Sequence, residues 1–135
     1  MSASPRRTAR TILIPLGTAD LDEVAGLYGD DRVMRYLDGG ARTRDQAKST
    51  LEAAERCWRA EGWGRWAIRD ADTGGLLGEG GLQHNFDIEG APVAFSIIVS
   101  RRVWNQGYGT EAGHVILDDA WDRYDAAAIH AVLHP

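Results

Sequence analysis

The stretch VSRRVWNQGYGTEA, residues 99–112, joins an apolar run to a pattern of helical spacing and decides the fold. Gly107 and Gly109 stand where the helix begins, and they remove side chains from its first turn. Successive backbone N–H groups are then free to converge on an anion at the positive end of the helix dipole. We expect a phosphate or pyrophosphate to bind there. The alternative is a glycine-rich helix start that serves only a tight turn.

The elements on either side of this stretch predict a parallel crossover. Residues 93–99 are almost continuously apolar, which is typical of a strand buried on both faces. Residues 108–124 have helical spacing, and residues 126–133 return to the pattern of a buried strand. The apolar stripe of the helix consists of Ala112, Val115, Ile116, Ala120 and Trp121.

The first half of the chain predicts one strand, a group of helices and a hairpin. Thr11–Pro15 is a β-branched run that ends at a proline, so we expect a strand at a sheet edge. Two capping boxes, Asp20 with Glu23 and Thr43 with Gln46, predict helices that end before Gly29 and Gly62. A shorter helical piece is predicted over 30–37. Residues 63–70 and 76–82 predict a hairpin, followed by a polar loop over 84–90.

At the glycine-rich stretch the sequence resembles the GNAT superfamily of acetyl-CoA-dependent N-acetyltransferases. The superfamily's signature is Q/R-x-x-G-x-G/A, which reads Trp104-Asn105-Gln106-Gly107-Tyr108-Gly109 here. A tryptophan at the first position, followed by G-Y-G-T-E-A, resembles the branch that acetylates the N-termini of ribosomal proteins. Further similarity extends over almost the whole chain, in residues 11–16, 33–37, 64–68, 77–82 and 134–135.

The resemblance implies a mixed α/β (α+β) fold of the GNAT type. Its mixed, mostly antiparallel sheet is flanked by helices and splays open between the fourth and fifth family strands, here 93–99 and 126–133. The family continues with another helix and two strands, so the resemblance implies that residues 1–135 form a single acetyltransferase domain that is incomplete at its C-terminus.

The resemblance also implies a reaction and a coenzyme site. An acetyl group would pass from acetyl-CoA to a primary amine, on a protein N-terminus or a small molecule, by direct attack in a ternary complex, without a metal. The amine would enter past the first two helices and the loop after the third family strand. The implied coenzyme-binding residues are Ile98, Val99, Trp104, Asn105, Gln106, Gly107, Tyr108, Gly109 and Thr110.

The catalytic base is the point where the sequence departs from its relatives. Relatives of this branch often carry a glutamate at the position of Ala94. Glu79 and His84 are our candidates for the base, and His84 is attractive because its ordinary pKa lies near neutrality. Asp87 and Glu89 are further candidates. For each of them the alternative is an ion-paired or solvated side chain without a catalytic role.

Composition narrows the class of protein. The chain has 15 Lys and Arg against 20 Asp and Glu, a net charge of −5, which argues against a nucleic-acid partner. No apolar run is long enough to cross a membrane, and Cys57 is the only cysteine, so we expect a cytoplasmic protein without an intramolecular disulfide. The strand over 126–133 would leave one edge unpaired, which predicts a possible homodimer or a longer native chain.

Two other functions remain open. One is a catalytically weak module that binds coenzyme A or a protein partner. The other is a nucleotide-phosphate binder, although neither a P-loop lysine nor a G-x-G-x-x-G motif with a later acidic residue is present.

Overall fold

The computed structural model describes residues 5–35, 40–88, 90–123 and 129–131. Their strands form a single six-stranded sheet. The strands lie in the order of the sequence, and each pairs antiparallel with the next, except for the parallel pair β5–β6. Their bounds are β1 Arg6–Arg7, β2 Thr11–Pro15, β3 Arg65–Asp70, β4 Leu76–His84, β5 Val93–Val99 and β6 Ile129–Ala131. The prediction that Thr11–Pro15 lies at the edge is wrong, because β1 pairs with its outer side.

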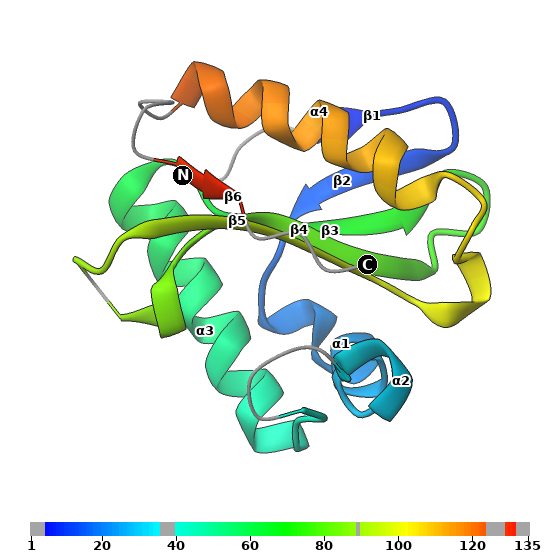
Figure 1. Ribbon diagram of the computed structural model, residues 1–135, viewed down its shortest axis with the longest axis horizontal. Coiled ribbons are helices and arrows are strands. Elements are labelled where there is room, and N and C mark those ends of the chain that lie inside the picture. Colours follow the sequence, from blue (N-terminus) through cyan, green and yellow to red (C-terminus); the bar gives the residue numbers. More distant parts are fainter. Residues whose placement is uncertain (1–4, 36–39, 89, 124–128, 132–135) are drawn as a thin grey trace.

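Helices cover both faces of this sheet (Figure 1). The helices α1 (Leu21–Tyr28), α2 (Asp31–Met34) and α3 (Arg44–Glu61) lie on one face, and α4 (Tyr108–Arg123) lies on the other. Short 3-10 turns are η1 (Thr18–Asp20), η2 (Asn85–Asp87) and η3 (Arg101–Val103). The helix α4 links β5 to β6, which confirms the predicted crossover within the described residues.

The ends of α3 follow its sequence signals, whereas the start of α1 does not. Thr43 and Gln46 form the predicted capping box, and Gly62 ends α3 in the left-handed conformation at φ +75°. Asp20 makes no side-chain cap for α1. Its carboxylate instead accepts from the Gly17 N–H at 3.0 Å and pairs with Arg69 at 2.6 Å, so the predicted Asp20–Glu23 box is wrong.

Two hydrophobic clusters hold the helices to the sheet. One joins α4 to the strands and includes Trp63, Trp66 and, from the end of α3, Trp58. The other packs α1, α2 and the rest of α3 on the opposite face. The apolar stripe of α4 is buried at Ala112, Ile116 and Ala120. Trp121 is 47% exposed, however, so its predicted place in the stripe is wrong.

The strand β5 is buried over only half its length. Val93, Ala94 and Phe95 are buried and pair with β6, whereas Ser96–Val99 are partly exposed. Within the described residues the parallel pairing ends at Phe95, so the prediction of burial on both faces holds for the first half alone. The second half of β5 leads into the glycine-rich stretch.

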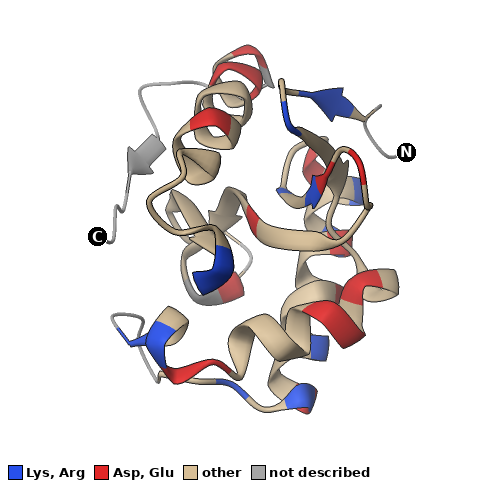
Figure 2. Cartoon of the chain, turned by 90° about the vertical axis from the view of Figure 1, so that its right-hand side faces the viewer, with Lys and Arg blue, Asp and Glu red and all other residues tan. Residues whose placement is uncertain are grey.

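Charged residues of both signs are interspersed over the helices and strands (Figure 2). In the part of the chain that the structure describes, no helix is long and apolar enough to span a bilayer. The same residues contain no cluster of three or more His, Cys, Asp or Glu side chains able to hold a metal ion.

Candidate active site

The junction between β5 and α4 leaves a row of backbone amides without protein partners. Among the described residues, no N–H from Asn105 to Thr110 donates a hydrogen bond, and the next N–H along α4 that does so is that of Glu111, to Gly107 O at 2.9 Å. Asn105 and Gly107 both have positive φ, +62° and +81°. This backbone conformation leads directly into the first turn of α4, where the helix dipole adds positive potential around the N–H groups.

The space beside Gly109 fits the approach of a ligand to this backbone. A Cβ at Gly109 would meet only the side chains of Val99 and Ile97, at 3.7–4.0 Å, which is ordinary contact. The fold therefore does not require glycine at this position, and its missing side chain leaves the first turn of α4 open. A pyrophosphate is the kind of anion that such an open row of amides binds.

Two predicted coenzyme residues also hold the junction together. Trp104 is 40% exposed, and its Nε1–H donates to Val99 O at 3.0 Å. Gln106 Nε2 donates to Arg102 O at 3.0 Å. The structure thus brings Val99 and residues 104–110 to one end of the sheet, whereas Ile98 packs into the cluster on the opposite face.

A residue that the sequence analysis missed lies at the same junction. Arg10 stacks over the Tyr108 ring, with its Cζ 4.0 Å from the ring centre, and its Nε lies 3.1 Å from Glu111 Oε1. Thr8 donates to the other oxygen of Glu111 at 2.5 Å. These bonds, the one from Thr8 above all, lower the pKa of Glu111. The only sequence signal was the group of arginines before β2, which gives no hint of α4.

Glu79 lies in a buried polar cluster between β4 and α1. It is 1% exposed, and its Oε2 accepts a hydrogen bond from the Tyr28 hydroxyl and lies 3.9 Å from Arg65 Nη1. Its Oε1 has no hydrogen-bond partner among the described residues. Burial, followed by the charge of Glu79, raises the pKa of Tyr28 well above its ordinary value, so Tyr28 stays protonated.

His84 lies at the last position of β4, not in a polar loop as predicted. Its Nδ1 is 2.8 Å from Ala91 O. A carbonyl oxygen only accepts, so Nδ1 carries a proton, and in the neutral form of the ring Nε2 is the acceptor. Nε2 has no hydrogen-bond partner among the described residues and lies 3.6 Å from Glu61 Oε1.

The structure does not bring Glu79 and His84 together. Glu79 is opposite Ile98 and His84 is opposite Val93 in the β4–β5 register. Five strand positions separate them, which corresponds to about 17 Å. His84 lies one position along β4 from Gln83, the partner of Ala94, and successive strand residues point to opposite faces of the sheet.

The remaining predicted candidates have different surroundings. Asp87 pairs with Arg65 at 2.5 Å, and Glu89 lies outside the described residues. The buried Trp63 packs its ring 5.2 Å from that of His84.

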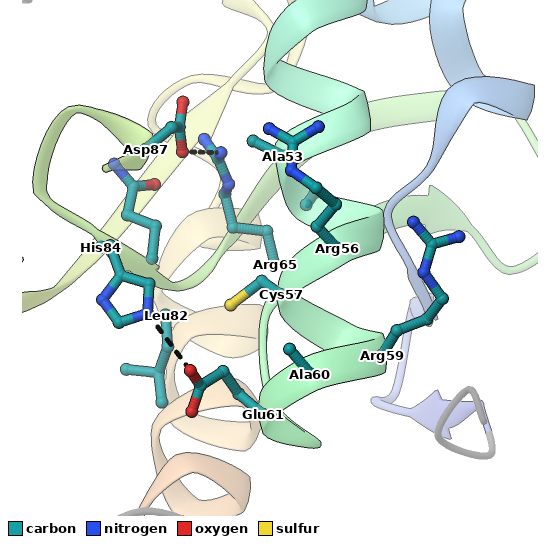
Figure 3. Close-up of a pocket in the computed structure, with 12 residues that line it drawn as sticks. Ala53, Arg56, Cys57, Arg59, Ala60, Glu61, Arg65, Leu82, His84 and Asp87 are labelled. Atoms are coloured by element: carbon teal, nitrogen blue, oxygen red, sulfur yellow. Dashed lines mark hydrogen bonds and ion pairs between the residues drawn. The ribbon is translucent and has the colours of Figure 1, made fainter. Parts of the chain in front are cut away.

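His84 and Asp87 line a pocket of about 350 Å³ between the second half of α3 and the end of β4. The pocket also takes in Cys57, Glu61 and Arg65, which the sequence analysis did not select (Figure 3). Burial raises the pKa of the Cys57 thiol to about 11, so this cysteine is not a thiolate at neutral pH. Alternation along β3 was the available signal for Arg65, because it places Arg65 on the face opposite to Trp66 and Ile68.

Comparison with known proteins places this fold and junction in a family. The family model of the acetyltransferase (GNAT) domain matches residues 10–135, so the chain belongs to this family. YkkB of Bacillus subtilis (strain 168), an uncharacterized protein, is 25% identical over 109 residues, which are 81% of this chain and 63% of YkkB. The chain therefore spans less than two thirds of the length of this curated relative.

Solved structures confirm the predicted fold class. An acetyltransferase from Agrobacterium tumefaciens str. C58 matches with a TM-score of 0.75 at 22% identity, over 90% of this chain and 69% of that one. Ribosomal-protein-S5-alanine acetyltransferase from Vibrio fischeri matches with a TM-score of 0.70 at 11% identity, over 89% of this chain and 68% of that one. At these identities the similarity shows the fold alone.

Proposed function

We propose that this protein transfers an acetyl group from acetyl-CoA to a primary amine by direct attack in a ternary complex. The observation that carries the proposal is the row of backbone N–H groups from Asn105 to Thr110 that donate no hydrogen bond among the described residues, beside the open position at Gly109. The amides of residues 106–110 would hold the pyrophosphate, and the backbone near Ile98 and Val99 would pair with the pantetheine chain. Acetyl-CoA, when bound, supplies the activated acetyl group as a thioester.

His84 is the residue to which we assign removal of the ammonium proton. Its Nδ1–H is engaged by Ala91 O, which leaves Nε2 as a proton acceptor. Nε2 also borders the pocket, where an amine has room to approach it. A base in this position takes the proton from the amine directly or through water.

Glu79 is the second candidate for the base. It is nearer to Ile98 than His84 is, and its Oε1 is free of hydrogen bonds among the described residues. Its Oε2, however, already accepts from Tyr28 and lies near the Arg65 guanidinium. Both neighbours hold this carboxylate in one position, so we assign Glu79 the lesser role of holding Arg65 in place.

The acceptor is a protein N-terminus or a small-molecule amine. The Trp104 motif and the structural match to a ribosomal-protein acetyltransferase support the former. The pocket beside His84 is large enough for the latter. Position 94 is an alanine where relatives often carry a glutamate, which favours a second function, that of a catalytically weak coenzyme A-binding module. One experiment separates the acetyltransferase from this module.

The test combines turnover with binding. Thiol release from acetyl-CoA is followed colorimetrically over a panel of amines, and coenzyme A and ATP are titrated separately by calorimetry. Turnover with at least one amine supports the acetyltransferase, whereas binding of coenzyme A without any turnover supports the module. Tighter binding of ATP than of coenzyme A would refute both and favour a nucleotide-phosphate binder.

A further inference from the structure

The pocket between α3 and the end of β4 has two polar ends and an apolar middle. Figure 3 shows Arg65 and Asp87 at one end, His84 and Glu61 at the other, and Cys57 between them. Apolar walls come from Leu82 and from alanines of α3. The volume of about 350 Å³ lies within the range of small-molecule sites.

Each polar end contains a buried atom that lacks a hydrogen-bond partner. Arg65 is 3% exposed, and its Nε–H donates to no acceptor among the described residues. His84 Nε2, at the other end, is likewise without a donor. Such atoms are costly in a folded protein unless a ligand or water satisfies them. The pocket therefore requires an acceptor at the Arg65 end and a donor at the His84 end.

The charges of the two ends define the ligand further. Arg65 is paired with Asp87 at 2.5 Å and also lies 3.9 Å from Glu79, so its positive charge is already balanced and this end suits an uncharged oxygen better than a carboxylate. The other end combines the Glu61 carboxylate with His84 Nε2, which accepts a hydrogen bond in the neutral form of the ring, and so suits an ammonium group. Arg56 and Arg59 also line the pocket and disfavour a second positive charge on the ligand.

Ion pairs hold the Arg65 end of the pocket in place. Asp87 pairs with Arg65 at 2.5 Å, and Arg65 Nη1 lies 3.9 Å from Glu79 Oε2. Asp87 has φ +57°, a left-handed conformation that aspartate adopts more readily than most residues with a side chain. The guanidinium is thus held by its contacts, and Nε–H is left for a ligand.

We propose that this pocket binds a monocationic aminoamide, with its ammonium group at Glu61 and His84, its amide oxygen at Arg65 Nε–H and its apolar chain along Leu82 and Cys57. This inference rests on the proposed function, because it takes the ligand to be the acceptor amine. The same chemistry occurs in a free aminoamide and at the N-terminus of a peptide.

The experiment measures binding by calorimetry in the absence of acetyl-CoA. The probes are ω-aminoalkanamides of three to six carbons, with pentylamine lacking the oxygen and cadaverine carrying a second cation. We expect the best aminoamide to bind at least tenfold more tightly than pentylamine and cadaverine. Trialanine, added as a further probe, shows whether a peptide terminus binds more tightly than a free aminoamide.

Two variants link the binding to this pocket. Glu61→Gln should weaken the best aminoamide at least tenfold, and Ala60→Phe should abolish its binding by filling the pocket. Glu52→Gln, an exposed neutralisation on the same helix, is the matched control and should leave the affinity unchanged. Circular dichroism verifies that each variant is folded.

The outcomes separate this inference from the proposed function. Equal affinity for pentylamine and the aminoamides, or unchanged affinity in Glu61→Gln, would overturn the assignment of the pocket. If coenzyme A fails to bind while the aminoamide binds as expected, the acetyltransferase proposal fails and the pocket stands as an aminoamide site. If coenzyme A binds and none of the amine probes does, the aminoamide site is refuted and the acetyltransferase proposal stands.

Discussion

The Tyr28 hydroxyl donates a hydrogen bond to Glu79 Oε2 across 51 positions of the sequence, and both side chains are almost completely buried. The pair joins α1 to the centre of the sheet, where water cannot replace a missing donor.

Tyr28→Phe should therefore destabilise the protein by about 1–3 kcal/mol, because it leaves a buried carboxylate oxygen with only the more distant Arg65. Urea unfolding measures the loss. Tyr108→Phe is the matched control, since no hydrogen bond of the Tyr108 hydroxyl is found among the described residues. An equal effect in the two variants would contradict the importance of the Tyr28–Glu79 bond.

Gly109→Asp should abolish binding of coenzyme A while leaving the fold intact. A side chain at this position meets only Val99 and Ile97 at ordinary contact distance, but it occupies the open first turn and adds a negative charge beside the expected pyrophosphate. Gly109→Ala should raise the Kd at least tenfold. Calorimetry measures both, with Gly26→Ala as the control because open space surrounds Gly26 on α1. Unchanged affinity in folded Gly109→Asp would refute the coenzyme site.

His84→Gln should lower kcat/KM roughly 100-fold or more, because the proton acceptor at Nε2 is lost, and should leave only the rise with pH that the free-amine fraction of the substrate imposes. Glu79→Gln should retain the wild-type profile. The pH profiles of both variants are compared with the wild type for the best amine found. Should both variants keep the wild-type rate and profile, neither side chain is the base and the proton leaves to solvent.

Cys57 should react slowly with thiol reagents in the folded protein. Its pKa of about 11 means that the thiolate is scarce at pH 8, roughly 200-fold scarcer than for an ordinary cysteine. Colorimetric thiol titration of the folded protein, with the urea-unfolded protein as the reference, measures the difference. Fast labelling of the folded protein at pH 8 would show that the thiol is less buried than described.

The contribution of Glu111 to stability should depend on pH. Its folded pKa lies below the ordinary value of 4.5, so its stabilising effect is fully present above that value and is lost as pH falls through the folded pKa. The difference in Tm between the wild type and Glu111→Gln should thus be largest near neutral pH and shrink below about pH 4.5. Thermal unfolding from pH 3 to 8 measures it. A difference that does not vary with pH would show that the carboxylate charge is unimportant.

The sequence predicted those elements whose signals are local. Thr43 and Gln46 are three residues apart, and each caps the other without help from the rest of the fold. Asp20 and Glu23 have the same spacing, but Arg69 lies near both carboxylates, and this competition depends on the distant strand β3. Trp121 follows the helical spacing of α4 yet remains exposed, because spacing alone does not say how wide the buried stripe is.

In the candidate site, too, the part formed by neighbouring residues could be predicted and the part formed by distant residues could not. Residues 105–110 are contiguous, so their sequence predicts a helix start whose backbone N–H groups have no partner among the described residues. The pocket instead gathers Cys57, Arg65 and His84 from α3, β3 and β4, and no sequence spacing relates them. Arg10 is a similar case, since its contacts with Tyr108 and Glu111 span about a hundred positions.

The bond from Thr8 to Glu111 also bears on the order in which the chain folds during synthesis. These residues are 103 positions apart, so the N-terminal segment cannot attach to α4 until residue 111 has left the ribosome. The hairpin β3–β4 and the helix α3 are complete well before that point. Until then the turn between β1 and β2 is held by the pairing of β2 with β3 and by the hydrogen bond from Ala71 N–H to Arg10 O, and the arrival of α4 adds the contact with Glu111.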